Sequence, residues 1–101
     1  MEVTRILDYY DGPILLECQM PGELYVAVAL NEEEWIVALV DDIESIQNDL
    51  REALINSKKW GLAKVEKWGQ VHSNFEVTDS TLCVIDGLHT TPVPNEYLPA
   101  K

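Results

Sequence analysis

The sequence predicts one α+β domain, a mainly antiparallel sheet of about five to seven strands with one amphipathic helix, residues 42–56, packed on it. Three observations predict this fold. The chain has 101 residues, a length that suits a single domain. Up to about residue 40, apolar side chains recur at every second position, which is the period of a strand. From Asp41 onward the spacing changes to that of a helix.

The first half is expected to form strands joined by tight turns. A strand from Val3 to Tyr9 ends at the turn sequence Asp11-Gly12-Pro13, and residues 16–20 alternate apolar and polar side chains before Pro21-Gly22. The next two strands, 24–30 and 35–40, are apolar on both faces. Each of these two strands therefore needs cover on both sides of the sheet.

The helix is expected to begin at Asp41, because Glu44 three residues later completes a capping box. Its apolar stripe comprises Ile43, Ile46, Leu50, Ala53 and Leu54. Asp49 followed by Glu52 could instead start a second short helix, so a break near Asn48 stays open.

Beyond Gly61, strands are expected over residues 62–68, 71–77 and 81–85, with turns at 78–80 and at Asp86-Gly87. The last segment, 90–101, contains three prolines and is predicted to be an extended tail of the same domain. We therefore expect residues 1–101 to form one domain.

The charge distribution is the most unusual property of the sequence. The net charge is −11, and residues 1–49 hold twelve acidic residues against one basic residue, while residues 50–101 hold six of each. A surface this acidic repels phosphates. The sequence therefore predicts no direct binding to nucleic acid or to an anionic membrane.

No stretch approaches the roughly 20 apolar residues of a membrane span, and Glu2 stands where a signal peptide would be basic. A cytoplasmic location is the expectation. In such a reducing compartment, Cys18 and Cys83 are predicted to be reduced, small, buried apolar residues.

Known catalytic and cofactor motifs are missing from the sequence. It contains neither a G-x-S-x-G elbow nor a G-x-G-x-x-G phosphate loop, and its acidic runs lack the alternating spacing of a calcium loop. His72, His89 and Cys83 have no spacing that would force them together. The sequence therefore predicts a protein that is not an enzyme and has no cofactor and no metal site.

Three segments carry a family resemblance. RILDYYDGPILLE at residues 5–17, DLREAL at 49–54 and PVPNEYLP at 92–99 resemble an uncharacterised family of small bacterial and phage proteins. Its members open with a DYYDGPLL-like motif and close with an LPxEYLP-like motif, and the stretch 56–90 is unmatched. The resemblance implies a fold and implies no activity.

Two groups of residues are candidates for binding a protein partner. The acidic residues that bracket the strand 35–40 could form one face or lie at its two ends. The segment 58–68 combines four lysines with two tryptophans, which suits core packing, a protein interface or stacking on nucleic acid bases. As an interface, this segment could meet the acidic half of a second copy of the chain and form a homodimer. The predicted partner-binding residues are Glu32, Glu33, Glu34, Asp41, Asp42, Trp60 and Trp68.

Together these features predict a non-catalytic acidic binding or inhibitor protein. We expect it to be encoded by a phage or mobile element and to occupy a basic surface on a host defence or nucleic-acid-handling protein. An immunity or antitoxin-like partner of a cognate toxin, and a structural accessory domain, are the alternatives. An enzyme is the least supported class.

Overall fold

The computed structural model describes residues 1–99 and consists mainly of β-strands. In chain order the strands are β1 (Glu2–Tyr9), β2 (Pro13–Met20), β3 (Glu23–Ala29), β4 (Glu34–Val40), β5 (Trp60–Lys67), β6 (Gln70–Val71) and β7 (Glu76–His89). Two short helices, α1 (Ile43–Asn48) and α2 (Leu50–Ile55), connect β4 to β5. A 3₁₀ turn, η1 (Asn95–Tyr97), lies near the C-terminus.

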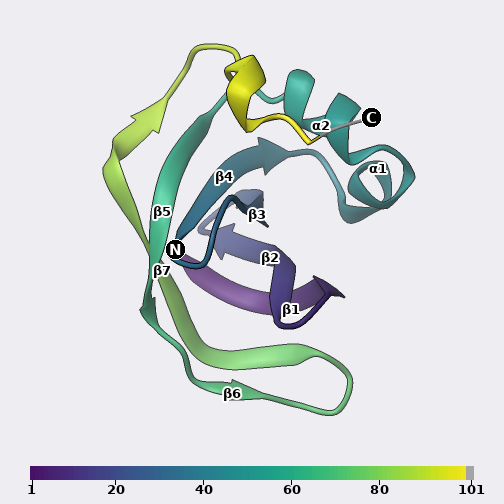
Figure 1. Cartoon of the computed structure of the whole chain (residues 1–101), viewed down its shortest axis with the longest axis vertical. Helices are drawn as coiled ribbons and strands as arrows, with labels where there is room; N and C mark the ends of the chain where they lie inside the picture. The colour runs from purple at the N-terminus through teal and green to yellow at the C-terminus, as the bar shows by residue number, and fades with distance from the viewer. Residues whose placement is uncertain (100–101) are drawn as a thin grey trace.

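Six strands close into an antiparallel barrel in the order β1-β2-β3-β4-β5-β7, and β7 pairs with β1 to complete it (Figure 1). The short strand β6 pairs with β7 beside the barrel. The predicted α+β class with one helix packed on a sheet is therefore wrong, because the protein is a mainly β barrel. Alternation along a strand shows which face is buried, but it is the same for an open sheet and a closed barrel.

Closure depends on β7, which is 14 residues long and pairs with two barrel strands in succession. Its first part pairs with β1, from Arg5 opposite Glu76 to Glu2 opposite Thr81, and the rest pairs with β5. Asp79 and the Asp86-Gly87 pair have positive φ angles, and the register with β5 shifts near Asp86-Gly87. The turns predicted at 78–80 and 86–87 are thus irregularities within one bent strand rather than ends of separate strands.

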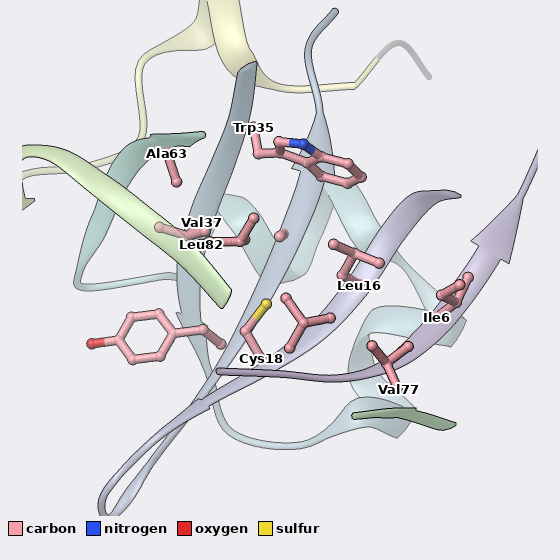
Figure 2. Packing of buried hydrophobic residues seen from close by; sticks show 11 residues of the cluster. Ile6, Leu16, Cys18, Trp35, Val37, Ala63, Val77 and Leu82 are labelled. Atoms are coloured by element: carbon pink, nitrogen blue, oxygen red, sulfur yellow. The ribbon is translucent and has the colours of Figure 1, made fainter. Parts of the chain in front are cut away.

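One face of each barrel strand fills the interior, where side chains from different strands point toward one another (Figure 2). The cluster comprises Val3, Ile6, Leu16, Cys18, Tyr25, Ala27, Trp35, Val37, Ala63, Val77 and Leu82. It is the main core of the protein.

The opposite face of β3 and β4 forms a second core outside the barrel, which we call the outer core. Val26 and Ile36 pack there with Ile46 of α1, Leu54 of α2 and Val93 of the C-terminal segment. The prediction that both strands need cover on two sides is therefore confirmed. The barrel interior covers one side, and the helices with the C-terminal segment cover the other.

The predicted helix 42–56 is two helices of six residues each, with the break at Asp49. The Asp49 carboxylate accepts a hydrogen bond from the Glu52 backbone N–H at 3.0 Å and so starts α2. The first helix is capped by Asp42, which accepts from the Ser45 N–H at 2.7 Å, and not by Asp41 as predicted. Local side-chain caps therefore interrupt a continuous apolar stripe.

The C-terminal segment is attached to the helical layer. Arg51 Nη1 donates to the Pro99 carbonyl oxygen at 2.7 Å, and Tyr97 and Leu98 pack on the outer core. Residues 100 and 101 of the predicted tail lie outside the described residues. Within residues 1–99, no helix has the length and apolar character needed to cross a membrane.

Candidate functional site

The meander of β1 to β5 brings three chain segments to one end of the barrel. In the observed register, Tyr9 lies opposite Pro13, Ala29 opposite Trp35, and Glu34 opposite Lys64. The β1–β2 turn, the β3–β4 turn and the end of β5 therefore lie together. We call this end, formed by residues 8–14, 29–35 and 64–69, the barrel mouth.

The five predicted acidic residues do not form one face. Glu32 to Glu34 lie at the mouth, whereas Asp41 and Asp42 follow β4 at its other end. Since β4 has seven residues, the two groups are separated by about 23 Å at roughly 3.3 Å per residue. The structure thus decides between the two arrangements that the sequence left open.

A pocket of about 730 Å³ opens at the barrel mouth. Three aromatic residues line it, Tyr10 from the β1–β2 turn, Trp35 from β4 and Trp68 directly after β5, together with the acidic residues Asp11 and Glu32. The rest of the wall is formed by Gly12, Pro13, Ile14, Ala29, Leu30, Asn31 and Val65. Mouths of β-barrels are frequent ligand-binding places, and a mainly apolar wall with a few charged groups is their usual chemistry.

The aromatic residues of the pocket differ in exposure. Tyr10 is 80% exposed and Trp68 is 40% exposed, while Trp35 is buried as part of the barrel core. In Figure 2, Trp35 lies at the edge of the interior cluster. The pocket therefore has one buried aromatic residue in its wall and two aromatic side chains open to solvent. Exposed aromatic groups beside a pocket are typical of recognition surfaces.

Trp68 is positioned by the glycine directly after it in the chain. Gly69 donates its backbone N–H to Ser80 Oγ at 2.8 Å, and Ser80 is fully buried. A Cβ atom at Gly69 would overlap the Thr78 carbonyl oxygen. Only glycine allows this close approach to β7, so the approach anchors the backbone next to Trp68.

The acidic residues of the mouth are held on an ordered turn. Asn31 Oδ1 accepts hydrogen bonds from the backbone N–H groups of Glu33 and Glu34, both at 2.9 Å, and Asn31 Nδ2 donates to Glu34 Oε1 at 3.2 Å. This is the Asx arrangement that asparagine favours in turns. Glu32 and Glu33 are exposed on it, so their carboxylates are presented to solvent with little loss of backbone freedom on binding.

The mouth carries an excess of negative charge. Residues 8–14, 29–35 and 64–69 contain six carboxyl side chains and two lysines. The salt bridges found in residues 1–99 join Arg5 to Glu76 at 3.6 Å and Lys59 to Glu23 at 3.1 Å, so neither Asp11 nor Glu32 is in one. A cationic group would be attracted to this end.

The basic segment 58–68 does not form one surface. Trp60 is buried in the outer core, with its ring centroid 4.6 Å from that of His89 and 5.7 Å from that of Tyr97, and its Nε1 donates to Thr91 Oγ1 at 3.3 Å. Trp68 lies instead at the mouth. The two tryptophans predicted to bind a partner therefore have different environments, and only Trp68 offers a substantial surface.

Lys59 is engaged within the chain. Its Nζ donates to Glu23 Oε2 at 3.1 Å, and the Tyr25 hydroxyl donates to Glu23 Oε1 at 3.0 Å. The hydrogen bond from Lys59 lowers the pKa of the Glu23 carboxyl, with the Tyr25 hydrogen bond as the next cause. This group lies near the start of β3, at the end of the barrel away from the mouth.

Asp41 lines a second pocket of about 460 Å³ between β4 and the helices. The other acidic residues there serve the helices, since Asp49 caps α2 and Glu52 accepts from Asn56 Nδ2 at 3.4 Å. Asp42 caps α1. Asp42, Asp49 and Glu52 thus have structural partners within the helices, whereas Asp41 lines the pocket without such a role among the described residues.

The two cysteines are free and lie in different environments. Cys18 is buried in the barrel, and burial raises the pKa of its thiol to about 12. Cys83 is exposed on β7, so the prediction that both cysteines are buried is wrong for Cys83. Cys83 directly follows the buried Leu82 in β7, so its side chain points to the opposite face of the strand.

The two histidines have separate neighbours. His72 Nε2 lies 3.1 Å from Thr78 Oγ1, and His89 packs on Trp60. In the described part of the chain, no group of three or more His, Cys, Asp or Glu side chains is arranged to hold a metal ion.

Sequence reasoning missed Tyr10, Asp11 and Trp35 as members of the site. A usable signal was present in Tyr9-Tyr10-Asp11-Gly12, because two tyrosines directly before a turn place at least one aromatic ring at its exposed tip. Comparisons of this chain with protein-family models, curated proteins and solved structures give no match. The resemblance seen in residues 5–17, 49–54 and 92–99 stays a prediction.

Proposed function

We infer that this protein is a non-catalytic binding protein that occupies a basic surface of a protein partner through its barrel mouth. One observation carries the proposal: Glu32 and Glu33 are presented on an ordered turn beside a pocket with two exposed aromatic residues, Tyr10 and Trp68. Tyrosine and tryptophan are the residues that most often dominate binding energy at interfaces. The acidic turn supplies long-range attraction to a basic partner.

The charge of the whole chain supports the same function. A net charge of −11 steers association with a basic surface and makes its rate strongly dependent on salt. We propose a host defence or nucleic-acid-handling protein as the target, because a dense acidic face can imitate the phosphates that such a protein binds. An immunity or antitoxin-like role would use the same surface on a cognate toxin.

The experiment compares two double charge reversals that change the net charge equally. Glu32→Lys/Glu33→Lys alters the mouth and keeps the Asn31 hydrogen bonds, which involve backbone N–H groups and Glu34. Asp41→Lys/Glu44→Lys alters exposed residues at the far end and keeps the Asp42 cap. The mouth variant should unfold at nearly the same temperature as the wild type, because exposed charges contribute little to stability. The far-end variant should unfold at a slightly lower temperature, because its two lysines replace acidic residues at the N-terminus of α1.

Proteins captured by the wild type from host lysate provide the binding partner, whose association rate is then measured at low and high salt. We expect the mouth variant to associate at least about tenfold more slowly at low salt, while the far-end variant keeps most of the wild-type rate. Equal slowing by the two variants would show that only net charge matters, and unchanged binding of the mouth variant would refute the proposal.

A further inference from the structure

The pocket at the barrel mouth combines flat aromatic faces with carboxylates. Tyr10 and Trp68 are exposed, and Asp11 and Glu32 line the same pocket. A cation above an aromatic ring gains about 0.5–1 kcal/mol at an exposed site, which corresponds to roughly two- to fivefold in affinity. A carboxylate beside it adds a charge-assisted hydrogen bond. The pocket therefore favours an organic cation over a neutral or anionic group.

We propose that this pocket receives an arginine side chain carried on a protruding loop of the partner protein, an inference that rests on the proposed function. A guanidinium group is planar, stacks on aromatic rings and presents paired N–H donors to a carboxylate, whereas the ammonium of lysine is a compact, strongly hydrated charge. Pro13 and Ile14 supply an apolar wall for the methylene stem.

The size and charge of the pocket agree with this occupant. Its volume of about 730 Å³ lies within the usual range for ligand pockets of roughly 300–1,000 Å³ and exceeds what one side chain fills, which leaves room for neighbouring loop residues. Asp11 and Glu32 are outside both salt bridges of residues 1–99, so their charge is available to an external cation. Of the nearby lysines, Lys64 lies opposite Glu34 in the strand register.

The test is an NMR titration with two blocked tripeptides of equal charge, Gly-Arg-Gly and Gly-Lys-Gly. The indole N–H signals of Trp35 and Trp68 report on the pocket, and that of Trp60, which is buried and bonded to Thr91, is an internal reference. We expect the arginine peptide to shift the two pocket signals and to bind at least about threefold more tightly than the lysine peptide. The Trp60 signal should not move.

Two pairs of matched variants localise the binding. Tyr10→Ala removes a pocket residue, whereas Tyr9→Ala removes an aromatic residue that is 58% exposed but outside the pocket. Glu32→Gln and Glu44→Gln form the same comparison for the carboxylates, because Glu44 is exposed on α1 at the other end of the barrel. We expect Tyr10→Ala and Glu32→Gln each to weaken arginine binding about two- to fivefold, with little effect of the two controls.

Equal binding of the two peptides would overturn the guanidinium assignment, and a lack of shifts at Trp35 and Trp68 would overturn the pocket as the binding place. Equal effects of the paired variants would overturn it as well. These outcomes are separate from the proposed function, which the charge-reversal experiment decides with the captured partner.

Discussion

Replacing Leu54 by alanine tests whether the helical layer is a structural part of the barrel. Leu54 is the fully buried residue of α2 and packs in the outer core with Val26 and Ile36. A six-residue helix is too short to be stable alone, so α2 depends on this contact. Removing a buried leucine side chain costs about 2–5 kcal/mol, through lost transfer energy and the cavity left behind. We expect Leu54→Ala to lower the free energy of unfolding by about 3 kcal/mol.

The neighbouring residue provides the matched control. Ile55 lies on the same helix and is 44% exposed, so Ile55→Ala should cost less than about 1 kcal/mol, partly because alanine is the better helix former. Both values come from urea unfolding followed by far-UV circular dichroism and tryptophan fluorescence, with Trp60 of the same core as the reporter. Equal losses for the two variants, or a loss below about 1 kcal/mol for Leu54→Ala, would refute the packing of α2 on the barrel.

Three further predictions concern the Trp68 anchor, the thiols and the response to acid. Gly69→Ala should destabilise the protein by about 2–4 kcal/mol and alter Trp68 fluorescence, because the Cβ of the new alanine would meet the Thr78 carbonyl oxygen and break the hydrogen bond to Ser80. Unchanged thermal unfolding would contradict this prediction. Thiol titration without reductant should detect one reactive cysteine in the native protein, Cys83, and two cysteines after unfolding, because Cys18 is buried and the pKa of its thiol is raised. Two rapidly reacting thiols in the native protein, or none after unfolding, would contradict this prediction. Glu23→Gln should lower stability at neutral pH and lose this effect in acid, because a carboxyl whose pKa is lowered by folding stabilises the protein only above that pKa. In urea unfolding between about pH 7 and pH 2, the difference in unfolding free energy between the variant and the wild type should shrink as the pH falls. A constant difference would exclude the Lys59 interaction as its cause.

Local sequence patterns were sufficient to predict the first four strands and the need of two of them for cover on both faces. Leu16 and Cys18 alternate with polar residues, and both lie inside the barrel, while the two-faced apolar pattern of residues 24–30 and 35–40 correctly required cover on both sides. These features result from the direction of successive side chains in a strand, which depends only on neighbouring residues. The acidic character of the β3–β4 turn is likewise a property of three adjacent residues.

Closure of the barrel and assembly of the site were decided only by the tertiary structure. Pairing of Glu2 with Thr81 joins residues far apart in the chain, and the apolar period that predicts each strand is the same whether or not that pairing forms. The same holds for the pocket, because Tyr10, Glu32 and Trp68 come from three separate turns whose proximity depends on the register of the intervening strands. The sequence shows that the negative charge lies in the first half of the chain. The fold places Glu32 to Glu34 at one end of β4 and Asp41 and Asp42 at the other, because an extended strand of seven residues separates the β3–β4 turn from the start of α1.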